Sequence, residues 1–273
     1  KFSCGNSEFN LEKAEHFIKK NINKDIKFND VQKKSKTSSA KPLYNLTDIQ
    51  QTASALFGMS PKQTLNIVQS LYERHKVLTY PRTDSRYLTS DMKNTLRDRV
   101  QAIGGDFKEI TAKLLREKDL NAKKIINNEK VSDHHAIIPT EQRPNYMSMS
   151  EMEMKIYNLV AKRFLENLLP DYKYEETTYS FTLENKVFSA KGLKVLQEGY
   201  KVLSKEEIQD KVINLNNGNF KLETLVYSKK QTTPSSYYTE GSLIYAMENP
   251  FEFVDDENER KILKETNGIG TVA

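Results

Sequence analysis

One short run of residues combines side chains that could perform nucleophilic chemistry. Residues 79–86 read Thr-Tyr-Pro-Arg-Thr-Asp-Ser-Arg, so Tyr80 stands two residues before Arg82 with a proline between them. A phenol has an ordinary pKa of about 10, so near neutral pH it needs a cation or a base beside it to attack an electrophile. The guanidinium of Arg82 could be that cation and could also hold a phosphodiester.

The same run has a structural interpretation. Proline disfavours the α region for the residue before it, so a tyrosine before proline commonly ends a strand. Asp84 and Ser85 would then be an ordinary turn or helix-start signal. By itself a Tyr-x-Arg triplet would be given a structural role and not a catalytic one. The surrounding segments decide between the two interpretations.

Four segments resemble a known family in content and in order. Residues 71–88, Leu-Tyr-Glu-Arg-His-Lys-Val-Leu-Thr-Tyr-Pro-Arg-Thr-Asp-Ser-Arg-Tyr-Leu, closely resemble the active-site segment of type IA DNA topoisomerases, most of all the topoisomerase III branch. Residues 41–50 are similar to the lead-in of that segment, and residues 133–140, Asp-His-His-Ala-Ile-Ile-Pro-Thr, to the histidine motif of the family. Residues 237–244 followed by 268–271 resemble the segment after it.

The resemblance implies catalytic roles for three residues. Tyr80 would attack single-stranded DNA and form a 5′-phosphotyrosyl bond, with Arg82 stabilising the phosphate charge. His134, three residues before the first isoleucine of its motif, would contact the phosphate or relay a proton, which suits an imidazole that titrates near pH 6.5. His135 is the weaker candidate, because the resemblance places the functional histidine of the motif at His134. Adjacent side chains of a strand point to opposite faces, so the two histidines make a poor zinc site.

Six further residues are candidate DNA contacts. The polar residues of the tyrosine run either bind the phosphate or hold the turn together, and Glu73 is either near the cleavage site or a solvent-facing helix residue. The set is Thr79, Thr83, Asp84, Ser85, Glu73 and Thr239. No metal ligand is predicted, because the family binds Mg²⁺ through an N-terminal toprim domain that we expect to be missing from this chain.

Composition and charge limit the class of protein. The chain has 273 residues, of which 37% are hydrophobic and 29% charged, as in a globular protein with a sizeable core. No apolar stretch approaches the ~20 residues of a membrane span, and Cys4 is the only cysteine, so we expect a cytoplasmic protein without a membrane partner. We also expect a monomer. A net charge of +5 favours a polyanion such as DNA without requiring one.

Hydrophobic periodicity predicts helices before Pro170 and strands after it. A helix capped by Thr47 and ended by Gly58, a second opened by Ser60 and Pro61, and an extended piece at 76–80 have the order of a winged-helix domain. In these two helices we expect Ile49, Ala53, Leu56, Leu65, Val68, Leu71 and Tyr72 to face inward. Other helices are expected at 11–21, from 90 through 100, at 107–117 and at 150–169, and a short strand at 26–28. After Pro170 the period becomes two, with turns at 184–185 and 217–218.

The expected fold class is α+β with several domains. The resemblance implies that residues 1–42 and 171–228 form one discontinuous β-rich domain. Residues 43–170 would be the inserted, helical, winged-helix-like domain that carries the tyrosine. Residues 229–273 would be the truncated start of a helical DNA-binding domain.

The expected function is that of a fragment of a type IA DNA topoisomerase, an isomerase that cleaves one strand, passes another and religates without ATP. Two alternatives remain. One is a winged-helix DNA-binding protein without catalysis. The other is a rolling-circle relaxase, although its two histidines flank a hydrophobic residue, a spacer that His134 and His135 lack.

The isolated chain is expected to bind DNA weakly and not to relax it, because the metal-binding domain would be absent. Incubation with supercoiled DNA and Mg²⁺, followed by gel electrophoresis, measures this directly. Relaxation by the chain alone would contradict the interpretation as a fragment.

Overall fold

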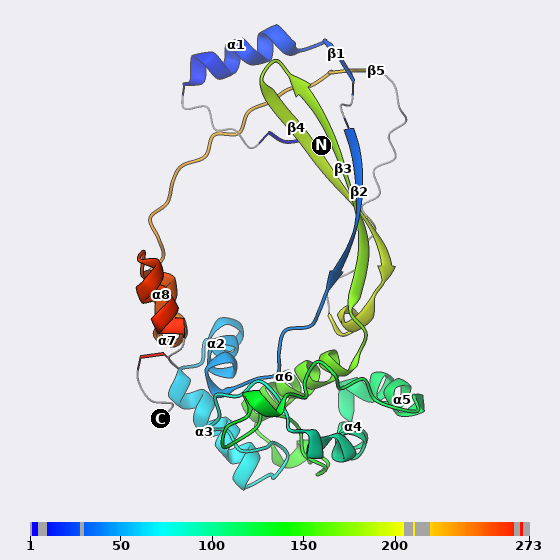
Figure 1. Ribbon diagram of the computed structural model, residues 1–273, viewed down its shortest axis with the longest axis vertical. Coiled ribbons are helices and arrows are strands. Elements are labelled where there is room, and N and C mark those ends of the chain that lie inside the picture. Colours follow the sequence, from blue (N-terminus) through cyan, green and yellow to red (C-terminus); the bar gives the residue numbers. More distant parts are fainter. Residues whose placement is uncertain are drawn as a thin grey trace. The chain divides into compact units, whose positions relative to one another are not determined.

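The computed structural model describes residues 2–4, 10–27, 30–204, 210, 219–264 and 268–269. Within these residues the chain is a mixture of helices and small antiparallel sheets (Figure 1), as predicted. It divides into two compact units. Unit 1 is Lys1–Ser38 with Asp171–Ser235, and unit 2 is Ser39–Pro170 with Ser236–Ala273.

Unit 1 is built on a three-stranded antiparallel sheet in the order β2-β3-β4. Its strands are β2 (Asp30–Ser38), β3 (Tyr172–Leu183) and β4 (Lys186–Gln197), and the predicted turn after β3 is present, with Glu184 at a φ of 53°. β1 (Asp25–Lys27) pairs with β5 (Asn219–Lys221), and α1 (Leu11–Asn21) matches the predicted helix. Phe28 and the turn predicted at 217–218 lie outside the described residues.

The apolar core of unit 1 lies at one end of this sheet. Phe181 and Phe188 stand opposite each other in the β3–β4 register, and their stacked rings are 5.3 Å apart between centroids. Around them pack Leu183 and the partly buried Phe2, Cys4, Phe17, Ile26, Leu222 and Leu225. Segments from both ends of unit 1 therefore share one core.

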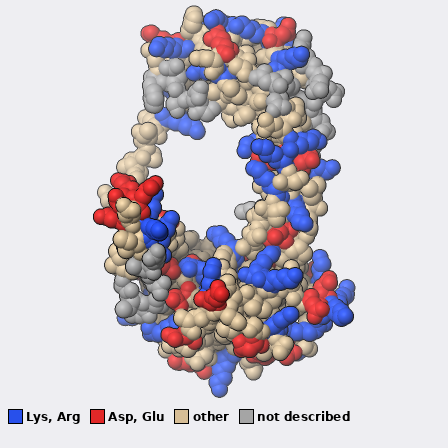
Figure 2. Space-filling model, in the orientation of Figure 1, with Lys and Arg blue, Asp and Glu red and all other residues tan. Residues whose placement is uncertain are grey.

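The sequence did not predict β2 as a strand, because its residues are polar and lysine-rich. It forms because it pairs with β3 along its whole length, from Asp30 opposite Ser180 to Ser38 opposite Tyr172. Figure 2 shows basic side chains gathered over this sheet. Its lysines are Lys33, Lys34, Lys36, Lys173, Lys186, Lys191 and Lys194, against three acidic residues in the same strands, Asp30, Glu175 and Glu176.

Unit 2 contains the remaining described helices, which include those that flank the tyrosine run. These are α2 (Leu46–Phe57), α3 (Pro61–Glu73), α4 (Leu96–Ala102), α5 (Lys108–Arg116), α6 (Glu151–Leu168), α7 (Glu240–Glu248) and α8 (Glu257–Lys264). The helix expected from 90 through 100 is split into a 3₁₀ turn at Ser90–Thr95 and α4. Further 3₁₀ turns lie at Gly105–Phe107, Asn128–Lys130, Tyr146–Ser148 and Pro250–Phe253, and in unit 1 at Gly199–Leu203.

The caps of α2 and α3 follow their local sequence, with one correction. Asn45, not Thr47, caps α2: its side chain accepts a hydrogen bond from the backbone N–H of Asp48, whereas Thr47 is already helical. Gly58 ends α2 at a φ of 65°, a left-handed conformation that glycine adopts without strain. Ser60 and Pro61 open α3 with a capping box, as predicted.

The predicted inner faces of α2 and α3 are correct for four of the seven residues. Ile49, Ala53, Val68 and Leu71 are buried. Leu56 is 61% exposed and Tyr72 37% exposed. Leu65 is half-buried, while Thr64 is fully buried.

Glu153 of α6 ties α6 to the end of α3. Its carboxylate accepts hydrogen bonds from Ser70 Oγ (2.7 Å) and Arg74 Nη2 (3.2 Å), and His75 Nε2 lies 3.2 Å away. It also accepts from the backbone N–H of Ser150, closing a capping box at the start of α6. Burial by itself raises the pKa of Glu153, but the hydrogen bonds from Ser70 and Ser150 and the charge of His75 outweigh it and lower the pKa to about 2.

Replacement Glu153→Gln should destabilise the protein in a pH-dependent way. Because the folded-state pKa lies near 2 and the ordinary value is 4.5, the stabilisation is complete above about pH 5 and is lost as the pH falls through 2. The expected loss at pH 7 is about 2–4 kcal/mol in the free energy of unfolding. Urea unfolding at pH 7, 5 and 3 measures it.

Glu151→Gln is the matched control. Glu151 lies in the same first turn, with its side chain 73% exposed and paired with Lys155. Its replacement should leave the free energy of unfolding nearly unchanged, because water screens an exposed pair. A Glu153→Gln deficit as large at pH 3 as at pH 7 would show that the carboxylate charge is not the cause.

Candidate active site

The tyrosine run begins on an extended segment that follows α3. Lys76 has a φ of 57° and turns the chain out of the helix. The extended piece predicted at 76–80 then pairs with the segment after the two histidines. Leu78 bridges Pro139, the N–H of Thr79 donates to Ile138 O (3.0 Å), and the N–H of Thr140 donates to Val77 O (3.0 Å).

Buried hydroxyl groups hold the two motifs together. Thr83 Oγ1 donates to His134 O at 2.8 Å and accepts from the N–H of Ser85 at 3.1 Å. Ser85 Oγ donates to Lys130 O at 2.7 Å, and Thr79 Oγ1 donates to Ala136 O at 3.2 Å. Thr83 is 4% and Ser85 5% exposed, so these two hydroxyl groups are buried and make their hydrogen bonds to atoms of the loops.

Tyr80 lies between two aromatic side chains. Its ring centroid is 4.4 Å from that of His134 and 5.5 Å from that of Tyr72. Tyr80 is half-buried, whereas the side chains of His134, Arg82 and Asp84 are exposed. Among the described residues we find no hydrogen bond to the Tyr80 hydroxyl and no ion pair to Arg82, so both groups are available to a ligand.

A pocket of about 600 Å³ opens beside Tyr80. It is lined by Tyr72, Glu73, Lys76, Leu78, Thr79, Tyr80, His135 and Thr140. Glu73 is exposed and accepts a hydrogen bond from Gln69. The side chain of Thr239 is elsewhere: it caps α7 by accepting from the N–H of Ser242, and no contact joins it to the tyrosine run in the described part of the chain.

His135 lines this pocket although sequence reasoning ranked it below His134. Burial lowers the pKa of His135, and the nearby charges of Arg99 and His134 lower it further, against the Ala136 carbonyl and Asp91, which raise it. Its Nδ1 lies 2.8 Å from Ala136 O, so the neutral ring carries its proton there and presents Nε2 as an acceptor. In the sequence, the position of His135 next to His134 was the one feature that pointed to a role for His135.

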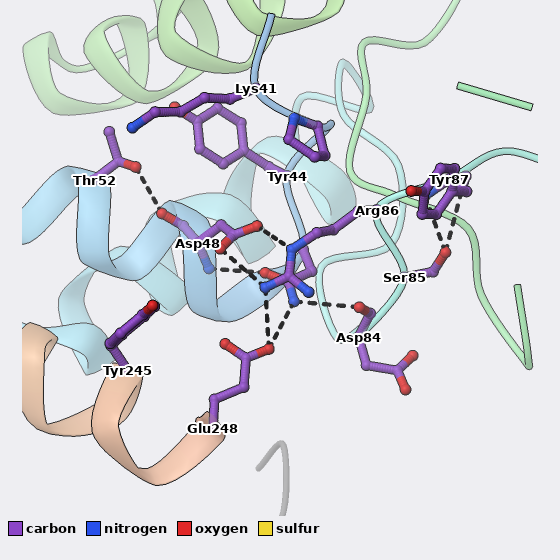
Figure 3. A network of polar contacts seen from close by, with 12 residues as sticks. Lys41, Tyr44, Asp48, Thr52, Asp84, Ser85, Arg86, Tyr87, Tyr245 and Glu248 are labelled. Atoms are coloured by element: carbon purple, nitrogen blue, oxygen red, sulfur yellow. Dashed lines mark hydrogen bonds and ion pairs between the residues drawn. The ribbon is translucent and has the colours of Figure 1, made fainter. Parts of the chain in front are cut away.

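Arg86, the last residue of the run, was not assigned a role from the sequence. Figure 3 shows its guanidinium between two carboxylates, Asp48 of α2 and Glu248 of α7. Burial alone lowers the pKa of Arg86, but the hydrogen bonds and charges of Asp48 and Glu248 raise it by more, so the group is always a cation. It anchors the run to the helices.

The residues that the structure describes contain neither a metal-binding cluster nor a membrane-spanning helix. No group of three or more His, Cys, Asp or Glu side chains could hold a metal ion there. Within the same residues, no helix is long and apolar enough to cross a membrane.

The chain matches the family described as DNA topoisomerase over residues 3–273 and belongs to it, as a type IA DNA topoisomerase. DNA topoisomerase 3 of Staphylococcus haemolyticus is 46% identical over 248 residues, which cover 89% of this chain and 35% of that protein. DNA topoisomerase 3 of Staphylococcus epidermidis is 45% identical over 268 residues, covering 96% and 37%. The chain therefore spans little more than a third of the length of these relatives.

A solved structure shares the fold. Full-length topoisomerase I from Thermotoga maritima aligns with a TM-score of 0.67 over 90% of this chain and 41% of that one, at 23% sequence identity. At this identity the likeness concerns the fold alone.

Replacement Thr83→Val should loosen the tyrosine loop from the histidine loop. It removes one donated and one accepted hydrogen bond at a buried site, which costs about 1–3 kcal/mol. Hydrogen exchange at the amides of Ser85 and Ala136 should accelerate accordingly. Thr83→Ser is the control, since it keeps both hydrogen bonds and loses only a methyl group; equal exchange in the two variants would show that the hydroxyl does not hold the loops.

Proposed function

We propose that this chain is the tyrosine-bearing part of a topoisomerase that cleaves single-stranded DNA by transesterification. The observation that carries the proposal is the placement of the Tyr80 ring against the ring of His134, with the exposed Arg82 two residues after Tyr80 in the chain. A phenol that meets an imidazole from a distant motif, with a guanidinium two residues along the chain, is suited to phosphoryl transfer.

The reaction uses these groups in a defined order. The Tyr80 oxygen attacks the phosphorus, a bond forms between them, and the bond from phosphorus to the 3′ oxygen of the preceding nucleotide breaks. The phenol proton passes to His134 or water, and a proton returns to the leaving 3′ oxygen. Arg82 balances the charge on the phosphate. Reversal by the 3′-hydroxyl reseals the strand, so the bond energy is conserved and no ATP is needed.

The residues around Tyr80 would divide the remaining work. Glu73, before the run, and Asp84, within it, are exposed and would contact DNA. Thr79, Thr83 and Ser85 would act by holding the loops. Thr239, at the start of α7, would contact DNA away from Tyr80. The lysines of β2, β3 and β4 support a polyanionic partner.

Mg²⁺ would be bound by parts of the whole protein outside this chain. The described residues do not fit such a site, since they hold no cluster of carboxylates, and no step above depends on the metal.

We also propose the domain division 1–42 with 171–228, 43–170 and 229–273, action as a monomer, and a cytoplasmic location. The swing of the tyrosine domain would open a gate for the passing strand.

Replacement Tyr80→Phe in the full-length protein should abolish the covalent complex with a single-stranded oligonucleotide while leaving its binding intact. The phenyl ring keeps the contacts to His134 and Tyr72, so only the nucleophile is lost. Denaturing gel electrophoresis of end-labelled DNA detects the covalent complex, and fluorescence anisotropy measures binding.

The control is Tyr72→Phe, the same change on the neighbouring ring, which should still form the complex. A covalent complex in Tyr80→Phe, or none in the wild type, would sink the proposed mechanism. In the second case a winged-helix DNA-binding protein without catalysis becomes the better description.

A further inference from the structure

Arg86 joins the tyrosine run to two helices that lie far apart in the sequence. Its Nε donates to Asp48 Oδ2 at 2.6 Å and its Nη2 to Asp48 Oδ1 at 3.0 Å. The same Nη2 donates to Glu248 Oε1 at 3.2 Å (Figure 3). Asp48 lies in the first turn of α2, and Glu248 is the last residue of α7.

Asn45 strengthens the attachment of the run to α2. Its Oδ1 caps the helix, and its Nδ2 donates to Asp84 O at 3.2 Å and to Glu248 Oε1 at 3.1 Å. The N–H of Leu46 donates to Thr83 O at 3.0 Å. The loop at 83–86 is therefore fixed to the start of α2 by backbone and side-chain contacts together.

The two carboxylates on Arg86 are not equivalent. Asp48 uses both oxygens in a two-pronged contact, the geometry in which a guanidinium binds a carboxylate best. Glu248 uses one oxygen, and its other oxygen is buried without a partner among the described residues. One cation neutralises one carboxylate, so the pair with Asp48 is complete by itself, and release of Glu248 would return a buried oxygen to water.

α7 packs closely against the side of α2. Gly241 is buried so close to α2 that an added Cβ would lie 2.8 Å from Ser54 Cβ. Ile244 of α7 is half-buried, while Leu243 is 47%, Tyr245 39% and Met247 41% accessible. Glu248 adds polar contacts to Arg86 and Asn45 at the end of α7.

We propose that Arg86, held by Asp48, is the positioning residue of the Tyr80 loop, and that Glu248 is a releasable second carboxylate through which α7 can leave α2 without freeing that loop. The catalytic part of this inference rests on the proposed function. Arg86 acts through Thr83 and Asp84 on the placement of Tyr80 and Arg82, and does not itself touch DNA.

Hydrogen exchange on this chain tests the releasable contact without any activity. Glu248→Ala should accelerate exchange of the amides of residues 243–249 by about two- to fivefold, the effect of losing a partly exposed ion pair, and leave residues 83–88 unchanged. Asp48→Ala should accelerate exchange at residues 83–88. Glu240→Ala, on an exposed position of the same helix, is the matched control for Glu248.

Cleavage of a single-stranded oligonucleotide by the full-length protein tests the positioning role. Asp48→Ala and Arg86→Lys should lower the rate constant of cleavage about 10- to 100-fold with KM unchanged, since a misplaced nucleophile slows the step without weakening binding. Glu248→Ala should cleave at the wild-type rate.

Three results would overturn the proposal. They are a cleavage defect in Glu248→Ala as large as in Asp48→Ala, faster exchange at residues 83–88 in Glu248→Ala, and a raised KM in Arg86→Lys, which would place Arg86 on the DNA. A wild type that forms no covalent complex would instead refute the proposed function, while the exchange measurements would still decide the role of Glu248.

Discussion

The hydrogen bonds between residues 77–85 and residues 134–140 are the constraint on which the candidate active site depends. Each motif alone is a loop with few internal contacts. The hydroxyls of Thr79 and Thr83 and the backbone pairing of Leu78 with Pro139 join them. Only because this pairing is satisfied does the ring of His134 lie against the ring of Tyr80.

The site separates groups that hold the loops from groups that are free to act. The small hydroxyl side chains of Thr83 and Ser85 are buried and spend their hydrogen bonds on backbone atoms. The charged or ionisable heads of Arg82, Asp84 and His134 remain exposed. This division follows from desolvation, since a buried hydroxyl needs only one or two partners, whereas a buried charge needs complete compensation.

Two charged clusters fix the surroundings of the tyrosine loop from opposite ends. Glu153 holds the end of α3 against α6, just before the extended segment, and Arg86 holds the end of the run against α2. Between them the chain turns sharply at Lys76. In the first cluster the carboxylate of Glu153 is buried, and in our proposal the second cluster contains one partner that can leave.

The sequence by itself determined many of the local elements and gave the hypothesis for the reactive residues. Ser60, Pro61 and Gly58 mark helix ends through interactions within a few residues, and the tyrosine and histidine motifs can be recognised from residue types in order. Tertiary structure alone decided that β2 is a strand and that His135 faces the pocket. It also decided that Arg86 meets Glu248, a residue 162 positions away. These features depend on partners distant in the chain, and local propensity and periodicity carry no information about which distant groups will meet.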